Sequence, residues 1–150
     1  MRRSSRLHGL RRCAALLASS LAGSAAACEG LAVTDAWIRE PPPGASAVAV
    51  YMTLTNTGND ALAIDTLTSP AFAHGMLHET VRDGERVRMQ SVARLPLAPG
   101  GRATLAPGAL HGMLMKPREG MPRAGERIEI VIGCGEQSTH LTLPVARDAP

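Results

Sequence analysis

The chain has 150 residues, a formal net charge of +3 and a hydrophobic content of 45%. Five of its 16 Lys and Arg residues lie within the first 12 positions, so the remainder carries 11 basic against 13 acidic side chains. This near balance removes any electrostatic argument for nucleic-acid binding. Aromatic side chains suited to stacking on bases or sugars are also scarce, with only Trp37, Tyr51 and Phe72 in the chain.

Residues 1–27 have the pattern of a secretory signal peptide. A basic segment (2–12) precedes a short apolar run (13–21), and small residues (23–27) follow it in an A-x-A arrangement. The apolar run has about half the length that a bilayer span requires, so it does not predict a membrane anchor. We therefore expect an exported, periplasmic protein whose mature part is one domain, residues 28–150.

Two cysteines remain after the leader, Cys28 and Cys134. In an oxidising compartment such a pair commonly forms a disulfide. Cys28 also stands where a lipoprotein signal places its lipidated cysteine, although Ala25 occupies the position at which that signal usually has leucine. Disulfide, lipidated cysteine and free thiol are thus the three fates to distinguish, and membrane attachment is expected only if Cys28 is lipidated.

Short segments rich in Val, Leu, Ile and Thr alternate with Gly- and Pro-containing turns along the mature chain. No segment shows the 3.6-residue periodicity of an amphipathic helix. Many short strands between such turns predict an all-β, antiparallel sandwich or barrel. The clearest strand candidates are 48–55, 61–68, 127–132 and 139–145.

A hairpin is predicted within residues 76–89, because Asp83-Gly84 lies between two β-like segments and this dipeptide suits a two-residue type I′ turn. A turn at these two residues pairs positions whose numbers sum to 167. That register places opposite charges across the strands, and it places His78 directly opposite Met89. The predicted charge pairs are Arg82 with Glu85 and Glu79 with Arg88.

A second His/Met pair lies in one later strand. His111 and Met113 are two residues apart and therefore share a face, which Met115 continues. Packed beside the hairpin, this strand would complete a set of two imidazoles and two thioethers with His78 and Met89. Thioethers are soft, neutral ligands, and together with imidazole they favour Cu(I) over zinc, magnesium or calcium.

Each of these residues also has an ordinary structural interpretation. Methionine in a β domain commonly fills gaps in the core, and we assign that role to Met52. Met121, beside a proline, is expected in a loop, and His140 is expected to be a surface histidine. His74 lies just before the hairpin and could support the metal ligands without binding the ion.

The intervals among the four candidate ligands resemble those of a known family, the periplasmic copper chaperones called PCu(A)C. Their pattern is H-x10-M-x21-H-x-M, and His78, Met89, His111 and Met113 reproduce every interval. The resemblance extends over nearly all of the mature chain, through the segments at 37–44, 51–56, 97–101, 105–108 and 110–115.

This resemblance implies a cupredoxin-like Greek-key β-barrel with an exposed site for one Cu(I) ion per chain. It also implies delivery of copper to the CuA centre of cytochrome c oxidase, with a CuA-containing oxidase subunit and a thioredoxin-like copper chaperone as partners. The chain departs from the family at Gly112, where an aliphatic residue is usual, so the strand between the two ligands could be looser or bulged. It also ends without the His/Met-rich tail that some members use for a second copper, which predicts a single site.

Other functions remain to be compared with this one. A blue-copper electron carrier would need a thiolate ligand in the cluster, and none of the four residues is a cysteine. No enzyme motif is recognisable, so the chain is not expected to be an enzyme. The alternatives that stay open are a periplasmic copper buffer or resistance protein without a dedicated client and a secreted adhesion module with incidental His and Met residues.

Overall fold

The computed structural model describes residues 27–150. The predicted signal peptide lies outside these residues, apart from Ala27. The described part of the chain folds into eleven strands, which confirms the all-β prediction, and within it no helix is long and apolar enough to cross a membrane. The strands are β1 (Leu31–Arg39), β2 (Ala47–Asn56), β3 (Leu62–Ile64), β4 (Thr66–Thr68), β5 (Phe72–Asp83), β6 (Arg86–Val92), β7 (Leu95–Leu97), β8 (Arg102–Leu105), β9 (Leu110–Pro117), β10 (Arg127–Cys134) and β11 (Gln137–Ala146).

Nine strands form one strongly curled sheet in the order β4-β10-β11-β1-β2-β9-β5-β6, with β8 pairing to β2 beside β9. Strands β3 and β7 form a separate two-stranded sheet. The ladders are antiparallel except for a short parallel pairing of β1 with β11, at Ile38 with Val145 and Arg39 with Ala146. The architecture is therefore the expected β sandwich or barrel with one parallel contact.

The core lies inside this curl, where the apolar side of each alternating strand faces inward. In β2 the buried residues include Val48, Val50, Met52 and Leu54, as an amphipathic strand requires. Leu67 of β4 reaches the far side of the sheet and packs against β5 and β9, which brings the two ends of the sheet together. Met52 is a core residue, as predicted.

A disulfide joins Cys28 to Cys134, across 106 positions of sequence. Both cysteines are buried, so the bridge fastens the segment that precedes β1 to the end of β10 inside the core. Of the three fates that the sequence left open for Cys28, the structure shows the disulfide. A sulfur in this bond cannot also carry a thioether-linked lipid, so the bond competes directly with lipidation of Cys28.

The β5–β6 hairpin is present, but its predicted register is wrong. The turn residues are Gly84 and Glu85, and Asp83 pairs with Arg86, so paired numbers sum to 169. Gly84 has φ of 59° while Glu85 does not have positive φ. This combination matches a type II′ turn, which requires glycine at its first central position.

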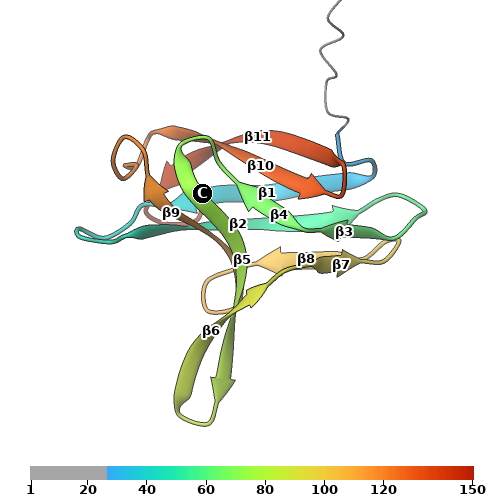
Figure 1. The fold of residues 1–150 in the computed structure, drawn as a ribbon, viewed down its shortest axis with the longest axis horizontal. Coiled ribbons are helices and arrows are strands. Elements are labelled where there is room, and N and C mark those ends of the chain that lie inside the picture. The colour runs from blue at the N-terminus through green and yellow to red at the C-terminus, as the bar shows by residue number, and fades with distance from the viewer. Residues whose placement is uncertain (1–26) are drawn as a thin grey trace, which may run out of the picture.

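The shift changes every cross-strand partner in the hairpin. His78 faces Ser91 and Met89 faces Thr80, and the two predicted charge pairs are not formed as direct pairs. Because the shift amounts to two residues, however, each side chain keeps its face of the ladder. The hairpin itself projects away from the body of the molecule (Figure 1), and β6 is the last strand at that edge of the sheet.

Candidate metal centre

The centre of the candidate site is a histidine pair that the sequence did not predict as neighbours. β5 and β9 are antiparallel partners, and their register places His78 directly opposite His111. The two ring centroids are 6.1 Å apart, with the ring planes at 89° to one another. Two imidazoles that face each other across one ladder can point toward a common ion.

The two methionines flank this pair on the same face. Met113 is two residues beyond His111 on β9, and Met89 on β6 is diagonal to His78 across the hairpin ladder. Diagonal positions have Cβ atoms roughly 7–8 Å apart, which long side chains can span. All four predicted ligands are thus brought to one face of three adjacent strands, β6, β5 and β9.

The backbone presets the ring of His111 for binding a metal. Its Nδ1 lies 2.9 Å from the carbonyl oxygen of Ala109, so that nitrogen donates a hydrogen bond in the neutral ring. The remaining nitrogen, Nε2, then carries the free lone pair. A histidine ligand in proteins is normally oriented by such a bond from its other ring nitrogen.

His78 shows an unsatisfied nitrogen at the same place. Its Nδ1 is buried and has no hydrogen-bond partner among residues 27–150. Burial lowers the pKa of His78 below its ordinary value of about 6.5, and the nearby His111 lowers this pKa further. The ring is therefore neutral at neutral pH, which is the form that binds metals.

The ligand chemistry of this face fits a soft ion. No three His, Cys, Asp or Glu side chains gather into a metal-holding group within residues 27–150, and the side chains that flank His78 and His111 on this face include the thioethers of Met89 and Met113. The two cysteines within residues 27–150 are joined to each other in the disulfide. Two imidazoles with neighbouring methionines suit Cu(I), whereas Mg²⁺ and Ca²⁺ prefer oxygen ligands.

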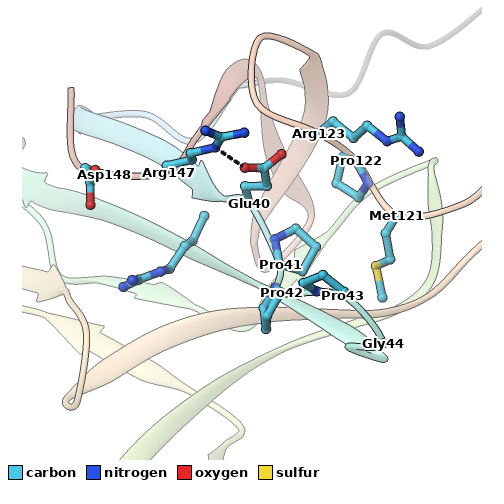
Figure 2. A pocket seen from close by; sticks show the side chains of 11 residues that line it. Glu40, Pro41, Pro42, Pro43, Gly44, Met121, Pro122, Arg123, Arg147 and Asp148 are labelled. Atoms are coloured by element: carbon cyan, nitrogen blue, oxygen red, sulfur yellow. Dashed lines mark hydrogen bonds and ion pairs between the residues drawn. The ribbon is translucent and has the colours of Figure 1, made fainter.

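The site is an open face and not a pocket. Met89 is 61% exposed, the largest exposure among the bulky apolar side chains of residues 27–150. A cavity of about 920 Å³ lies elsewhere and is lined by none of the four candidate ligands. Figure 2 shows its four prolines, Met121 and the ion pair of Arg147 with Glu40, whose Nε and Oε2 atoms are 2.7 Å apart. Within the candidate site, Met89 is thus accessible from outside, whereas His111 is buried at 7% exposure.

Gly112 separates the two ligands of β9 without any bulge. It pairs in register with Val50 on one side and Leu77 on the other, so the looser strand expected there is not observed. A Cβ at Gly112 would lie 2.9 Å from Leu67 Cδ1 and 3.0 Å from Val50 Cβ. Glycine stands here because β4 presses directly on the back of the ligand-bearing strand.

Three further residues singled out from the sequence, Met121, His140 and His74, are not among the four candidate ligands. Met121 lies in the loop after β9, as expected, and packs against the core. His140 is exposed on β11 and lies 2.8 Å from Glu129, far from any cluster of ligands in the described chain. His74 is on β5, opposite Met115, on the same face as His78.

The sequence interpretation missed Met76. It lies directly opposite Met113 and two residues before His78, so it shares the face of the candidate site. The signal was available in the spacing, because His74, Met76 and His78 alternate at the period of a β-strand. It was overlooked because only the strand pairing shows what lies across from it.

Comparisons with known proteins come from sequence and from structure. Residues 31–145 match the family model described as "LpqE-like: Putative lipoprotein LpqE-like". A curated relative, the putative lipoprotein Lxx21020 of Leifsonia xyli subsp. xyli, is 29% identical over 134 residues, which is 89% of this chain and 79% of that protein.

Solved structures share the fold at lower identity. The copper-bound PCuAC domain from PmoF2 matches with a TM-score of 0.66 and 20% identity, over 85% of this chain and all of that domain. DR1885 from Deinococcus radiodurans in its Cu(I) form matches with a TM-score of 0.61 and 23% identity, over 87% of this chain and 84% of that one. The chain thus belongs to the LpqE-like family and has the cupredoxin-like fold of the PCuAC copper chaperones, as the spacing of its histidines and methionines indicated.

Proposed function

We propose that this chain is a periplasmic copper carrier. It binds one Cu(I) ion through His78, Met89, His111 and Met113 and delivers it to the CuA centre of cytochrome c oxidase. The copper is cargo that passes through the protein, and the chain acts as a carrier and not as an enzyme. Its protein partners are a CuA-containing oxidase subunit and a thioredoxin-like copper chaperone.

The observation that carries this proposal is the convergence of two imidazoles and two thioethers on one open face. His111 is held by Ala109 with Nε2 free, and the buried Nδ1 of His78 lacks a partner in the described chain. An uncompensated buried nitrogen is rare in folded proteins and commonly marks a functional site. The copper-bound PmoF2 domain and the Cu(I) form of DR1885, which share this fold, also support it.

The exposure of the site suits transfer more than storage. All four ligands are neutral, so the charge of the ion is not compensated by the protein. Met89 lies on the projecting hairpin, at the sheet edge, where an incoming ligand of a partner can approach. Exchange then proceeds as the partner's ligand bonds to the ion and the thioether of Met89 leaves, without any change in oxidation state.

The location follows from the leader and the disulfide. Residues 1–27 direct export, and a disulfide between Cys28 and Cys134 suits an oxidising compartment. Because this bond occupies the sulfur of Cys28, we propose that the mature chain is released into the periplasm without a lipid anchor on that residue. A mass spectrum of the purified mature protein that shows acyl chains on Cys28 would contradict this.

Replacing single thioethers tests the ligand set. We expect Met89→Leu and Met113→Leu each to weaken Cu(I) binding by more than about tenfold, since even loss of an outer-shell partner costs roughly 10–100-fold at metal sites. Affinity is measured by competition with a chromophoric Cu(I) chelator, with ascorbate as a reductant that leaves the disulfide intact. Met121→Leu and His140→Gln are matched controls outside the site and should bind copper like the unaltered chain.

The variants should keep the fold, because the Met89 side chain is largely exposed and Met113 does not belong to the core. Circular dichroism and unfolding midpoints verify this. Unchanged copper affinity in both folded variants would refute the assignment. A carrier should in addition pass Cu(I) to an apo CuA domain faster than a small-molecule Cu(I) complex does, whereas a copper buffer without a client would show no such acceleration.

A further inference from the structure

The face that carries the candidate site continues along β5 and β9 beyond it. The register pairs Met76 with Met113, and then His74 with Met115, each directly opposite the other. Directly opposed residues have Cβ atoms roughly 5 Å apart. Three successive cross-strand pairs on this face therefore consist entirely of histidine and methionine.

These additional methionines do not serve the hydrophobic core. Met52 is part of the core and Met121 packs against it, whereas Met76 and Met115 belong to neither group. Both are half-buried on the face opposite Leu77 and Leu114, which point inward and are buried. Gap-filling, the ordinary role of methionine in a β domain, does not explain these two residues.

Strand β2, which pairs with β9 on the side away from β5, places small side chains beside Met113 and Met115. Ala49 lies opposite Met113 and Ala47 lies opposite Met115, so small side chains border the row of thioethers. Seven of the ten histidines and methionines within residues 27–150 lie on this one face, while the other three lie in the core, in a loop and on β11. The concentration of soft ligands exceeds what a single four-ligand site uses.

We propose that His74, Met76 and Met115 form a second Cu(I) position, weaker than the first and in line with it. One imidazole and two thioethers make a neutral, soft set that is suited to Cu(I). With a rise of about 3.3 Å per residue, the His74–Met115 pair lies about 13 Å from the His78–His111 pair. The Met76–Met113 pair lies midway, about 7 Å from each, and can hand an ion from one position to the other.

This position is independent of the client and of the four-ligand site, so it can be tested separately from the proposed function. The mature chain, with its disulfide intact, is titrated with Cu(I) in the presence of ascorbate and a competing chelator. We expect two bound equivalents, the second weaker than the first. The triple variant His74→Ala/Met76→Leu/Met115→Leu should lose the second equivalent and keep the first with unchanged affinity.

A complementary variant removes ligands of the four-ligand site and leaves the second position unaltered. Met89→Leu/His111→Ala should lose the tight equivalent and keep the weaker one at His74, Met76 and Met115. If this variant binds no copper while the triple variant binds normally, the second position does not exist and the four-ligand site stands. If copper binding by this variant equals that of the unaltered chain, the four-ligand assignment fails while the second position stands.

Labelled methionine methyl groups provide a readout at each residue. During the titration, the methyl signals of Met89 and Met113 should shift with the first equivalent and those of Met76 and Met115 with the second. The signals of Met52 and Met121 should not move and serve as internal controls. A single bound equivalent, or shifts of Met76 and Met115 that coincide with those of Met89, would overturn the proposal of a separate second position.

Discussion

The two faces of the β5–β9 ladder differ completely although they belong to the same strands. On the inner face, Leu77, Gly112 and Leu114 are buried against the core and against Leu67 of β4. On the outer face, the neighbouring positions carry His78, His111 and Met113. The inner face supplies the burial that stabilises the two strands, and the outer face carries the proposed copper ligands. Folding stability and copper affinity can therefore be altered by substitutions on different faces.

The largest expected effect concerns the body of the molecule. Cys28 and Cys134 close a loop of 106 positions, and loss of such a bond costs about 5 kcal/mol of folding free energy by the chain-entropy estimate. We expect Cys134→Ser to lower the free energy of unfolding by about this amount. Urea unfolding of the mature variant at neutral pH measures it.

Copper affinity should respond little to the same change as long as the variant stays folded, since neither cysteine is among the proposed ligands. The double variant Cys28→Ser/Cys134→Ser removes the free thiol that would otherwise compete for Cu(I) and is therefore the suitable form for this measurement. A large loss of affinity in the folded double variant would show that the two regions are coupled.

A smaller effect is expected at the boundary between the faces. Gly112→Ala would place a methyl group within 3.0 Å of Val50 and of buried Leu67, and such overpacking costs about 1–3 kcal/mol. Because Gly112 lies between His111 and Met113, this variant should weaken copper binding through displacement of the strand. The pair Gly112→Ala/Leu67→Ala, which vacates the contact, should restore much of the copper affinity. Thermal unfolding measures the stability of these variants, and chelator competition measures their copper affinity. An unaltered unfolding midpoint in Gly112→Ala would contradict the packing argument.

The smallest effect is that of pH on the outer face. The pKa of His78 is lowered in the folded chain, so its contribution to stability is complete above its ordinary value near 6.5 and is lost as the pH falls below that value. Cu(I) binding should be constant above neutral pH and should weaken on acidification, by about tenfold for each pH unit below the lowered pKa of His78. His111 faces His78 directly across the ladder. An affinity that stays flat from pH 7.5 to 5.0 would argue against histidine ligation.

The hairpin shows which inferences from sequence are robust. The Asp83-Gly84 signal predicted a turn correctly, but a glycine with positive φ is compatible with a type II′ turn that begins one residue later. Local sequence does not distinguish these two registers, and the apparent charge pairing favoured the wrong one. The candidate site survived because a shift of two residues preserves the face on which His78 and Met89 lie.

Gly112 and Met76, by contrast, have neighbours that the local sequence does not predict. Nothing within β9 indicates that Leu67, 45 positions earlier, presses on Gly112. Nothing within β5 indicates that Met76 faces Met113. Both facts depend on which strands become neighbours, and in a sheet dominated by non-local pairing that information is distributed over the whole chain.

The sequence by itself determined the β class and the spacing of the four candidate ligands, and it left the disulfide open as one of three fates of Cys28. The β class follows from a local rule, because the side chains of a strand alternate with a period of two. The tertiary structure alone decided that His78 meets His111, that β4 supports the strand behind them, and that the row of soft side chains extends to His74 and Met115. The physical reason is that backbone hydrogen bonds between distant strands set the register, and register decides which side chains stand across from one another.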